Sequence, residues 1–108
     1  MRHCFALDLK DDPALIEAYE AHHKNVWPEI IKSIKDAGIE NMEIYRAGNR
    51  LFMIMEVNEK FSLEKKKAAD LKNPQVQEWE KLMWQYQRAL PHANQGEKWM
   101  LMDKIFSL

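Results

Sequence analysis

The sequence predicts an α+β fold, in which a four-stranded antiparallel sheet carries helices on one of its faces. Strand patterns open and close the chain and form a hairpin in the middle. Pairs of helices fill both intervals between these strands, and the order is β-α-α-β-β-α-α-β. No repeat, linker or low-complexity stretch interrupts it, so residues 1–108 are expected to form a single domain.

Residues 2–9 predict the first strand, because their side chains alternate between two faces. One face carries Phe5, Leu7 and Leu9, and the other carries Cys4, Ala6 and Asp8. Asp12 predicts a helix cap, with Pro13 at the first helical position, where its missing N–H costs nothing. The stripe that this helix is expected to bury consists of Leu15, Ile16, Tyr19 and Val26.

A second helix is predicted to begin at Pro28. Proline disfavours helical geometry in the residue before it, so Trp27 is expected at a corner between the two helices. The second helix is expected to bury Ile30, Ile31 and Ile34. It is predicted to stop at Gly38, whose place suits a left-handed cap.

A hairpin follows, with strands over residues 42–45 and 51–57 and a turn over residues 47–50. Residues 51–55 are apolar without interruption, so both faces of that strand are expected to be covered. The helices of so short a chain can cover only one face of a four-stranded sheet. The other face therefore requires a bound ligand or a second subunit.

The second half of the chain predicts a short helix over residues 61–71, with Ser62 near its cap, and another that starts at Pro74. The inner side of the later helix is expected to carry Val76, Trp79, Leu82, Met83 and Tyr86. After a loop, residues 98–108 predict the last strand. Trp84 and Trp99 are interpreted as core or interface anchors.

Composition argues against a nucleic-acid partner. The 16 Lys and Arg residues are interspersed with 17 Asp and Glu residues, and the formal net charge is -1. The densest basic run, residues 65–67, stands among Glu64 and Asp70, which is typical of a solvated helix face. We therefore expect no binding to nucleic acid.

Several further classes lack their sequence signals. No apolar run approaches the length of a membrane helix, and the first residues lack the apolar core of a signal peptide, so we expect a cytoplasmic protein without membrane contact. The one cysteine, Cys4, cannot form an internal disulfide and is expected to pack on a strand face rather than act as a nucleophile.

Known cofactor and metal motifs are also missing. The sequence has no GxGxxG, P-loop, CxxC or HExxH motif. His22 and His23 cannot both turn to one metal ion from a regular helix, and His3 and His92 lie in distant segments without ligand spacing. We expect neither a cofactor nor a metal.

The stretch around His23 concentrates the residues suited to chemistry. Tyr19, His23 and Trp27 are spaced by four, so an uninterrupted helix would place them along one edge. Histidine can act as both acid and base near neutral pH. His22 points about 100° away and is expected to be structural. Because a half-buried histidine is more often a hydrogen-bonded core residue, the spacing alone leaves both interpretations of His23 open.

Several segments at fixed spacing resemble one known family. They are Tyr19-x-x-x-His23-Lys24-Asn25-Val26-Trp27-Pro28-Glu29, Met42-Glu43-Ile44-Tyr45, Leu51-Phe52-Met53-Ile54-Met55-Glu56 and Gln77-Glu78-Trp79. In these segments the chain resembles the L-rhamnose mutarotase family over nearly its whole length. The pattern of Tyr, His and Trp-Pro-Glu is the most specific part of the resemblance.

The resemblance implies a ferredoxin-like fold that pairs into a dimeric α/β barrel. Members of the family interconvert the α and β anomers of a 6-deoxyhexose without a cofactor. Carried onto this chain, the resemblance implies that His23 is the central acid/base, with Tyr19 beside it. Trp27 and Trp79 are expected to stack on the sugar, and the protein is expected to be a homodimer.

One departure from the family concerns the late helix. The rhamnose enzymes have adjacent tryptophans there, whereas this chain has Trp79 followed by Glu80. Glu80 is expected to line the substrate site and to replace a stacking face with a hydrogen-bond acceptor, so L-fucose is a candidate substrate beside L-rhamnose. Trp84 could supply the second aromatic ring only from a shifted helix.

The expected reaction needs only proton transfer. It removes a proton from the anomeric hydroxyl and adds one to the ring oxygen, which opens the ring so that it can close on the other face. Two other function classes stay open. One is a non-catalytic, dimeric sugar-binding or sensor module, and the other is a small cofactorless oxygenase or lactone isomerase.

Overall fold

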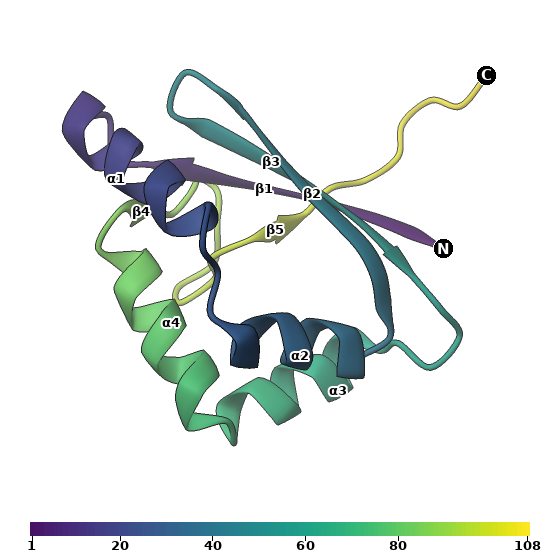
Figure 1. The fold of residues 1–108 in the computed structure, drawn as a ribbon. Coiled ribbons are helices and arrows are strands. Elements are labelled where there is room, and N and C mark those ends of the chain that lie inside the picture. Colours follow the sequence, from purple (N-terminus) through teal and green to yellow (C-terminus); the bar gives the residue numbers. More distant parts are fainter.

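The computed structural model describes residues 1–108 and confirms the predicted order of strands and helices through the fourth helix. The elements are β1 (Arg2–Leu9), α1 (Pro13–His23), α2 (Pro28–Asp36), β2 (Ile39–Ala47), β3 (Arg50–Val57), α3 (Leu63–Leu71), α4 (Pro74–Trp84), β4 (Gln87–Arg88) and β5 (Met100–Leu101). Figure 1 shows α2, α3 and α4 together on one side of the sheet. The α+β fold is therefore confirmed.

The sheet is antiparallel and has the order β2-β3-β1-β4, with β5 also paired to β1. Within the β1 and β3 pair, Leu7 lies opposite Leu51 and Phe5 lies opposite Met53. These four side chains are buried on the helix side of the sheet, so the predicted face of Phe5, Leu7 and Leu9 is the inner face of β1. Two apolar clusters, one around Tyr19 and Trp79 and one around Phe5 and Met53, form the core there.

The helices begin where the capping residues predict. Asp12 accepts hydrogen bonds from the backbone N–H groups of Ala14 and Leu15, and Ser62 accepts one from Lys65. The side chain of Asn73 caps α4 in the same way. Each of these bonds satisfies an N–H group that the helix itself leaves unpaired.

The bend between α1 and α2 places Trp27 outside both helices. Pro28 holds Trp27 in an extended conformation, with φ of -58° and ψ of 138°, and α1 has already ended at His23. Trp27 therefore leaves the helical edge that Tyr19 and His23 share. Ile31, which was predicted to be buried, is 39% exposed on α2.

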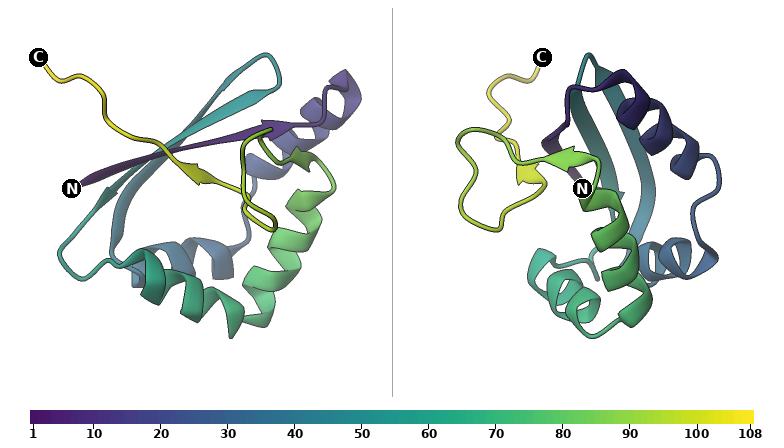
Figure 2. Two further views of the ribbon diagram at one scale, coloured as in Figure 1. Left: turned by 180° about the vertical axis from the view of Figure 1, so that it is seen from behind. Right: turned by 90° about the vertical axis from the view of Figure 1, so that its left-hand side faces the viewer.

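The last strand, predicted over residues 98–108, is much shorter in the structure. Only Met100–Leu101 pairs with β1, and residues 102–108 are exposed without regular structure. Part of the same edge of β1 is taken by β4, which the sequence analysis missed. Since Leu101 lies opposite Phe5, a continued strand would pass the end of β1 at Arg2 after a few residues. Figure 2 shows this segment leaving the body of the protein beyond β5.

The outer face of the sheet carries apolar side chains that no helix covers. Phe52 and Ile54 alternate with the buried residues of β3 and are only half-buried. Their cross-strand neighbours on β1 are Ala6 and Cys4. Trp84 was interpreted as a core or interface anchor, and the core part of that interpretation is wrong, because its side chain is 41% exposed.

Candidate active site

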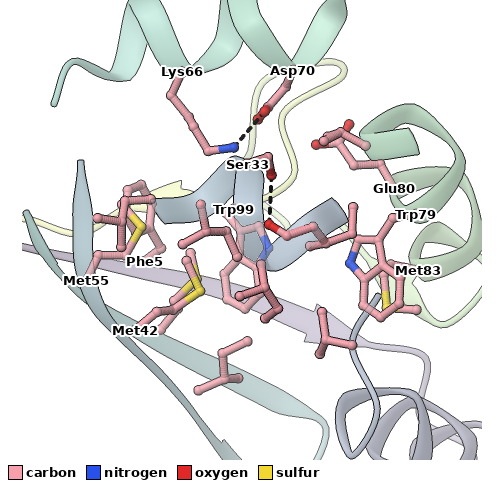
Figure 3. A pocket seen from close by; sticks show the side chains of 18 of the residues that line it. Phe5, Ser33, Met42, Met55, Lys66, Asp70, Trp79, Glu80, Met83 and Trp99 are labelled. Atoms are coloured by element: carbon pink, nitrogen blue, oxygen red, sulfur yellow. Dashed lines mark hydrogen bonds and ion pairs between the residues drawn. The ribbon is translucent and has the colours of Figure 1, made fainter. Parts of the chain in front are cut away.

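A cavity of about 700 Å³ lies between the inner face of the sheet and helices α2, α3 and α4. Figure 3 shows the side chains around it. Tyr19, His23, Trp79 and Glu80 are among the residues that line it, so the structure brings these predicted site residues together. Trp27, the remaining predicted residue, does not line it. Its ring instead packs edge-on against Trp79, with the ring centres 5.1 Å apart.

The orientation of the His23 ring follows from one hydrogen bond. Its Nδ1 lies 2.9 Å from the carbonyl oxygen of Tyr19, one turn earlier on α1. A carbonyl oxygen can only accept, so Nδ1 carries the proton and the neutral ring keeps a free lone pair on Nε2. Burial lowers the pKa of His23 below its ordinary value, and the nearby His22 lowers it further, against the opposing effect of the bond to Tyr19. The neutral form is therefore favoured, and its Nε2 can accept a proton.

Tyr19 lies directly beside this ring. The two ring centres are 4.4 Å apart, and the side chain of Tyr19 is only 3% exposed. Its hydroxyl accepts a 3.4 Å hydrogen bond from the side-chain amide of Gln87, a buried residue of β4. Burial raises the pKa of Tyr19, and the bond from Gln87 opposes this effect. The phenol thus stays protonated near neutral pH, with its own proton available for donation.

His22 occupies a different environment from its neighbour. Its Nε2 lies 3.2 Å from the hydroxyl of Tyr86, and its ring packs against the rings of Tyr86 and Trp79. It is half-buried and does not line the cavity. These contacts join α1 to the end of α4, which is the arrangement expected of a structural histidine.

A second, smaller cavity of about 470 Å³ also reaches His23. Tyr19, His23 and Ile44 line both cavities. An exposed ion pair between Arg46 and Glu20 borders the second one. His23 is therefore part of the wall of both cavities.

Sequence reasoning missed several residues of the main cavity. Gln87 lines it from β4, which was not predicted, and Trp99 lines it from the residue just before β5. Lys66 and Asp70 line it from α3, and both are largely buried, so the prediction that this helix face is solvated is wrong for Lys66. Asp70 follows Lys66 by four residues, the spacing of a helical ion pair. Nothing in the sequence, however, distinguishes Lys66 from the exposed lysines on either side of it.

None of the protein's helices combines the length and apolar character needed to cross a bilayer. No group of three or more His, Cys, Asp or Glu side chains is arranged to hold a metal ion.

Comparison with known proteins agrees with the resemblance seen in the sequence. The family described as L-rhamnose mutarotase matches residues 2–108. An L-fucose mutarotase from Xanthomonas campestris pv. campestris is 48% identical over 99% of this chain and 87% of its own length. An L-rhamnose mutarotase from Phocaeicola vulgatus is 30% identical over 86% of this chain and 82% of its own length.

Solved structures support the same fold. An L-rhamnose mutarotase from Formosa agariphila superposes with a TM-score of 0.74 at 21% identity, covering 100% of this chain and 98% of that one. Tetracenomycin F2 cyclase from Streptomyces glaucescens gives a TM-score of 0.64 at 19% identity, with coverage of 100% and 96%. The predicted ferredoxin-like α+β class is thereby confirmed. By its match over almost every residue, the chain belongs to the L-rhamnose mutarotase family, whose named members are isomerases that act on sugars.

Proposed function

We propose that the protein is a cofactor-independent aldose mutarotase that interconverts the α and β anomers of a 6-deoxyhexose. One observation carries the proposal above the others. The bond from His23 Nδ1 to the Tyr19 carbonyl oxygen leaves Nε2 as a free base at a cavity wall. A protonated phenol, that of Tyr19, stands beside it. Ring opening of a hemiacetal needs one base and one acid, and this pair supplies both.

In the proposed mechanism, Nε2 of His23 takes the proton of the anomeric hydroxyl while the ring oxygen gains a proton. Either Tyr19 donates that proton, or the protonated His23 passes the anomeric proton to the ring oxygen while Tyr19 hydrogen-bonds the charge that develops there. The bond between C1 and the ring oxygen breaks, and the open-chain aldehyde forms. After rotation about the bond between C1 and C2, the hydroxyl adds to the other face of the aldehyde, and the protons return. Such an acid/base pair contributes roughly 10² to 10⁴ in rate.

For the substrate, we propose L-fucose ahead of L-rhamnose. The relative that is 48% identical is named an L-fucose mutarotase, whereas the named rhamnose enzymes match at lower identity. Glu80 lines the cavity beside Trp79 and offers a hydrogen-bond acceptor to a sugar hydroxyl. Trp79 gives an apolar surface for the sugar face, and Trp27 supports that ring from behind.

We also propose that the protein is a homodimer whose sheets pack through their outer faces. Phe52 and Ile54 lie half-buried on that face, with Tyr45 exposed beside Phe52 on the neighbouring strand. Monomeric proteins rarely leave such contiguous apolar surface to water. A Phe52→Lys variant is expected to sediment as a monomer under conditions in which the unaltered protein is dimeric. Sedimentation of the unaltered protein as a monomer at micromolar concentration would refute the dimer.

The function is tested by saturation-transfer NMR of the anomeric protons. We expect the unaltered protein to accelerate exchange between the α and β anomers of L-fucose, and of L-rhamnose to a smaller extent. Binding without acceleration would refute the enzyme and indicate a sugar-binding module. Exchange at the rate of the free sugar, with no binding, would refute both.

A further inference from the structure

An ion pair lines the main cavity on the side formed by α3. The Nζ atom of Lys66 lies 2.6 Å from Oδ1 of Asp70, one turn later on the helix. Their side chains are only 18% and 19% exposed, and both residues are part of the cavity wall. Figure 3 shows the pair above the cavity, on the same side of it as the carboxylate of Glu80.

Stability does not account for the burial of this pair. Taking two charges out of water costs about as much free energy as their attraction returns, so apolar residues of similar size would serve the fold equally well. Helix α3 buries no residue completely and is the helix least embedded in the core. The adjacent lysines, Lys65 and Lys67, are exposed, and Lys66 is the one lysine of this run that lines the cavity.

A second pair of the same kind offers a direct comparison. Lys32 and Asp36 on α2 have the same residue types, order and spacing, and their N–O distance is 2.5 Å. Their side chains, however, are 76% and 62% exposed. The exposed pair is an ordinary surface contact, whereas the pair on α3 lines the cavity.

The cavity wall is otherwise mostly apolar, because 17 of its 27 residues are hydrophobic. Sites for small polar ligands typically combine such a wall with a few placed polar groups that fix the ligand's orientation. The ammonium group of Lys66 has three donors and uses one of them on Asp70, and the second oxygen of Asp70 makes no hydrogen bond within the protein. Both side chains can therefore bind hydroxyl groups while they hold each other in place.

The backbone of α3 is also fixed at this point. The side-chain amide of Gln77, on α4, donates a 2.8 Å hydrogen bond to the carbonyl oxygen of Asp70. The end of α3 is thereby tied to the helix that carries Trp79 and Glu80. The backbone that carries Asp70 is therefore already ordered before a ligand binds, which lowers the entropy cost of binding.

We propose that Lys66 and Asp70 bind hydroxyl groups of the sugar and determine which 6-deoxyhexose the site accepts. This inference rests on the proposed function. L-Fucose and L-rhamnose differ in configuration at C2 and C4, so groups that contact ring hydroxyls can tell them apart. The pair acts on binding and orientation, while proton transfer stays with His23 and Tyr19.

The test uses two matched double variants of the full chain, Lys66→Met/Asp70→Leu and Lys32→Met/Asp36→Leu. Each removes a pair without leaving a single charge unpaired. Anomeric exchange is measured against sugar concentration for L-fucose and L-rhamnose, together with thermal unfolding. For the cavity variant we expect KM for the preferred sugar to rise about tenfold or more, with kcat changed only a few-fold. We also expect the ratio of kcat/KM between the two sugars to change by at least about threefold.

The surface variant is expected to match the unaltered protein in KM, kcat and sugar preference. Unaltered KM and preference in a folded cavity variant would overturn the inference, as would an equal loss for both sugars. If the double variant fails to fold, the single variants Lys66→Gln and Asp70→Asn decide by the same readouts. Failure of the unaltered protein to accelerate exchange would instead refute the proposed function, so the two failures are distinguishable.

Discussion

The carbonyl oxygen of Tyr19 lies 2.9 Å from Nδ1 of His23 and so determines which ring nitrogen faces outward as a base. Both residues belong to α1, and their spacing of four is the spacing at which side chains on a helix meet. The same turn therefore orients the base and brings the phenol of Tyr19 beside it.

The activity is expected to persist to a lower pH than an ordinary histidine would allow. Burial lowers the pKa of His23, so its neutral, proton-accepting form survives below the ordinary value of about 6.5. The acid limb of kcat/KM for anomeric exchange, measured across pH 4 to 8 in roughly half-unit steps, should have its midpoint below that value. An acid midpoint at or above about 6.5 would contradict this environment for His23.

The same shift affects stability. The folded protein binds fewer protons at His23 than the unfolded chain does between the lowered pKa and about 6.5. The free energy of unfolding should therefore fall as the pH drops through this window, and the loss should be complete below the folded pKa. Urea unfolding of the unaltered protein and of His23→Ala measures the effect, because the free energy of unfolding should fall more steeply with falling pH in the unaltered protein than in the variant, which lacks this group.

Exchanging Glu80 for tryptophan should move the sugar preference toward L-rhamnose. The change removes a carboxylate from the cavity wall and adds a stacking face beside Trp79. We expect the ratio of kcat/KM for L-fucose to that for L-rhamnose to fall by about tenfold in Glu80→Trp. Glu78→Trp is the control, because Glu78 is exposed on the same helix and does not line the cavity. A ratio that stays unchanged in Glu80→Trp would show that Glu80 does not contact the sugar.

Replacing Gly38 with alanine should destabilise the fold without altering the site. Gly38 has a φ of 95°, and a Cβ atom there would lie 2.4 Å from the side-chain oxygen of Asn58. That oxygen also accepts a hydrogen bond from the backbone N–H of Lys60, so moving it breaks a turn. We expect a loss of about 2 to 4 kcal/mol in the free energy of unfolding.

Gly48→Ala provides the matched control for this prediction. Gly48 also has a positive φ, of 60°, but nothing lies within 4 Å of a Cβ atom there. Its replacement should cost only the backbone strain, about 1 kcal/mol. Thermal unfolding measures the loss of stability in both variants. Equal losses would mean that the contact with Asn58 contributes nothing.

Local signals made most of the fold predictable from the sequence. Asp12, Ser62 and Asn73 cap their helices by short-range bonds, and Gly38 needs a left-handed backbone that few residues adopt. The end of the chain was not predictable in this way. Whether Met100 continues a strand depends on how much of β1 remains unpaired, and this is decided by residues far away in the sequence.

The candidate site was also predictable only where local sequence signals determine it. The contact between Tyr19 and His23 follows from helical spacing, and the contact between His23 and Trp79 follows from the family resemblance. The position of Trp27 behind Trp79 depends on the angle at which two helices meet, which spacing does not give. Lys66 looked like its exposed neighbours because only the packing of α3 against α4 beside the cavity distinguishes them.

The central claim is that His23, and not His22, carries the proton transfer. The two variants His23→Ala and His22→Ala test it most directly, with anomeric exchange of L-fucose measured by saturation-transfer NMR and stability by thermal unfolding. We predict that His23→Ala lowers the enzymatic exchange rate by about 10² or more, with little change in stability. His22→Ala should keep most of the activity but lose about 1 to 3 kcal/mol, because the hydroxyl of Tyr86 loses its partner. Loss of exchange in a folded His22→Ala protein, with exchange retained in His23→Ala, would contradict the account.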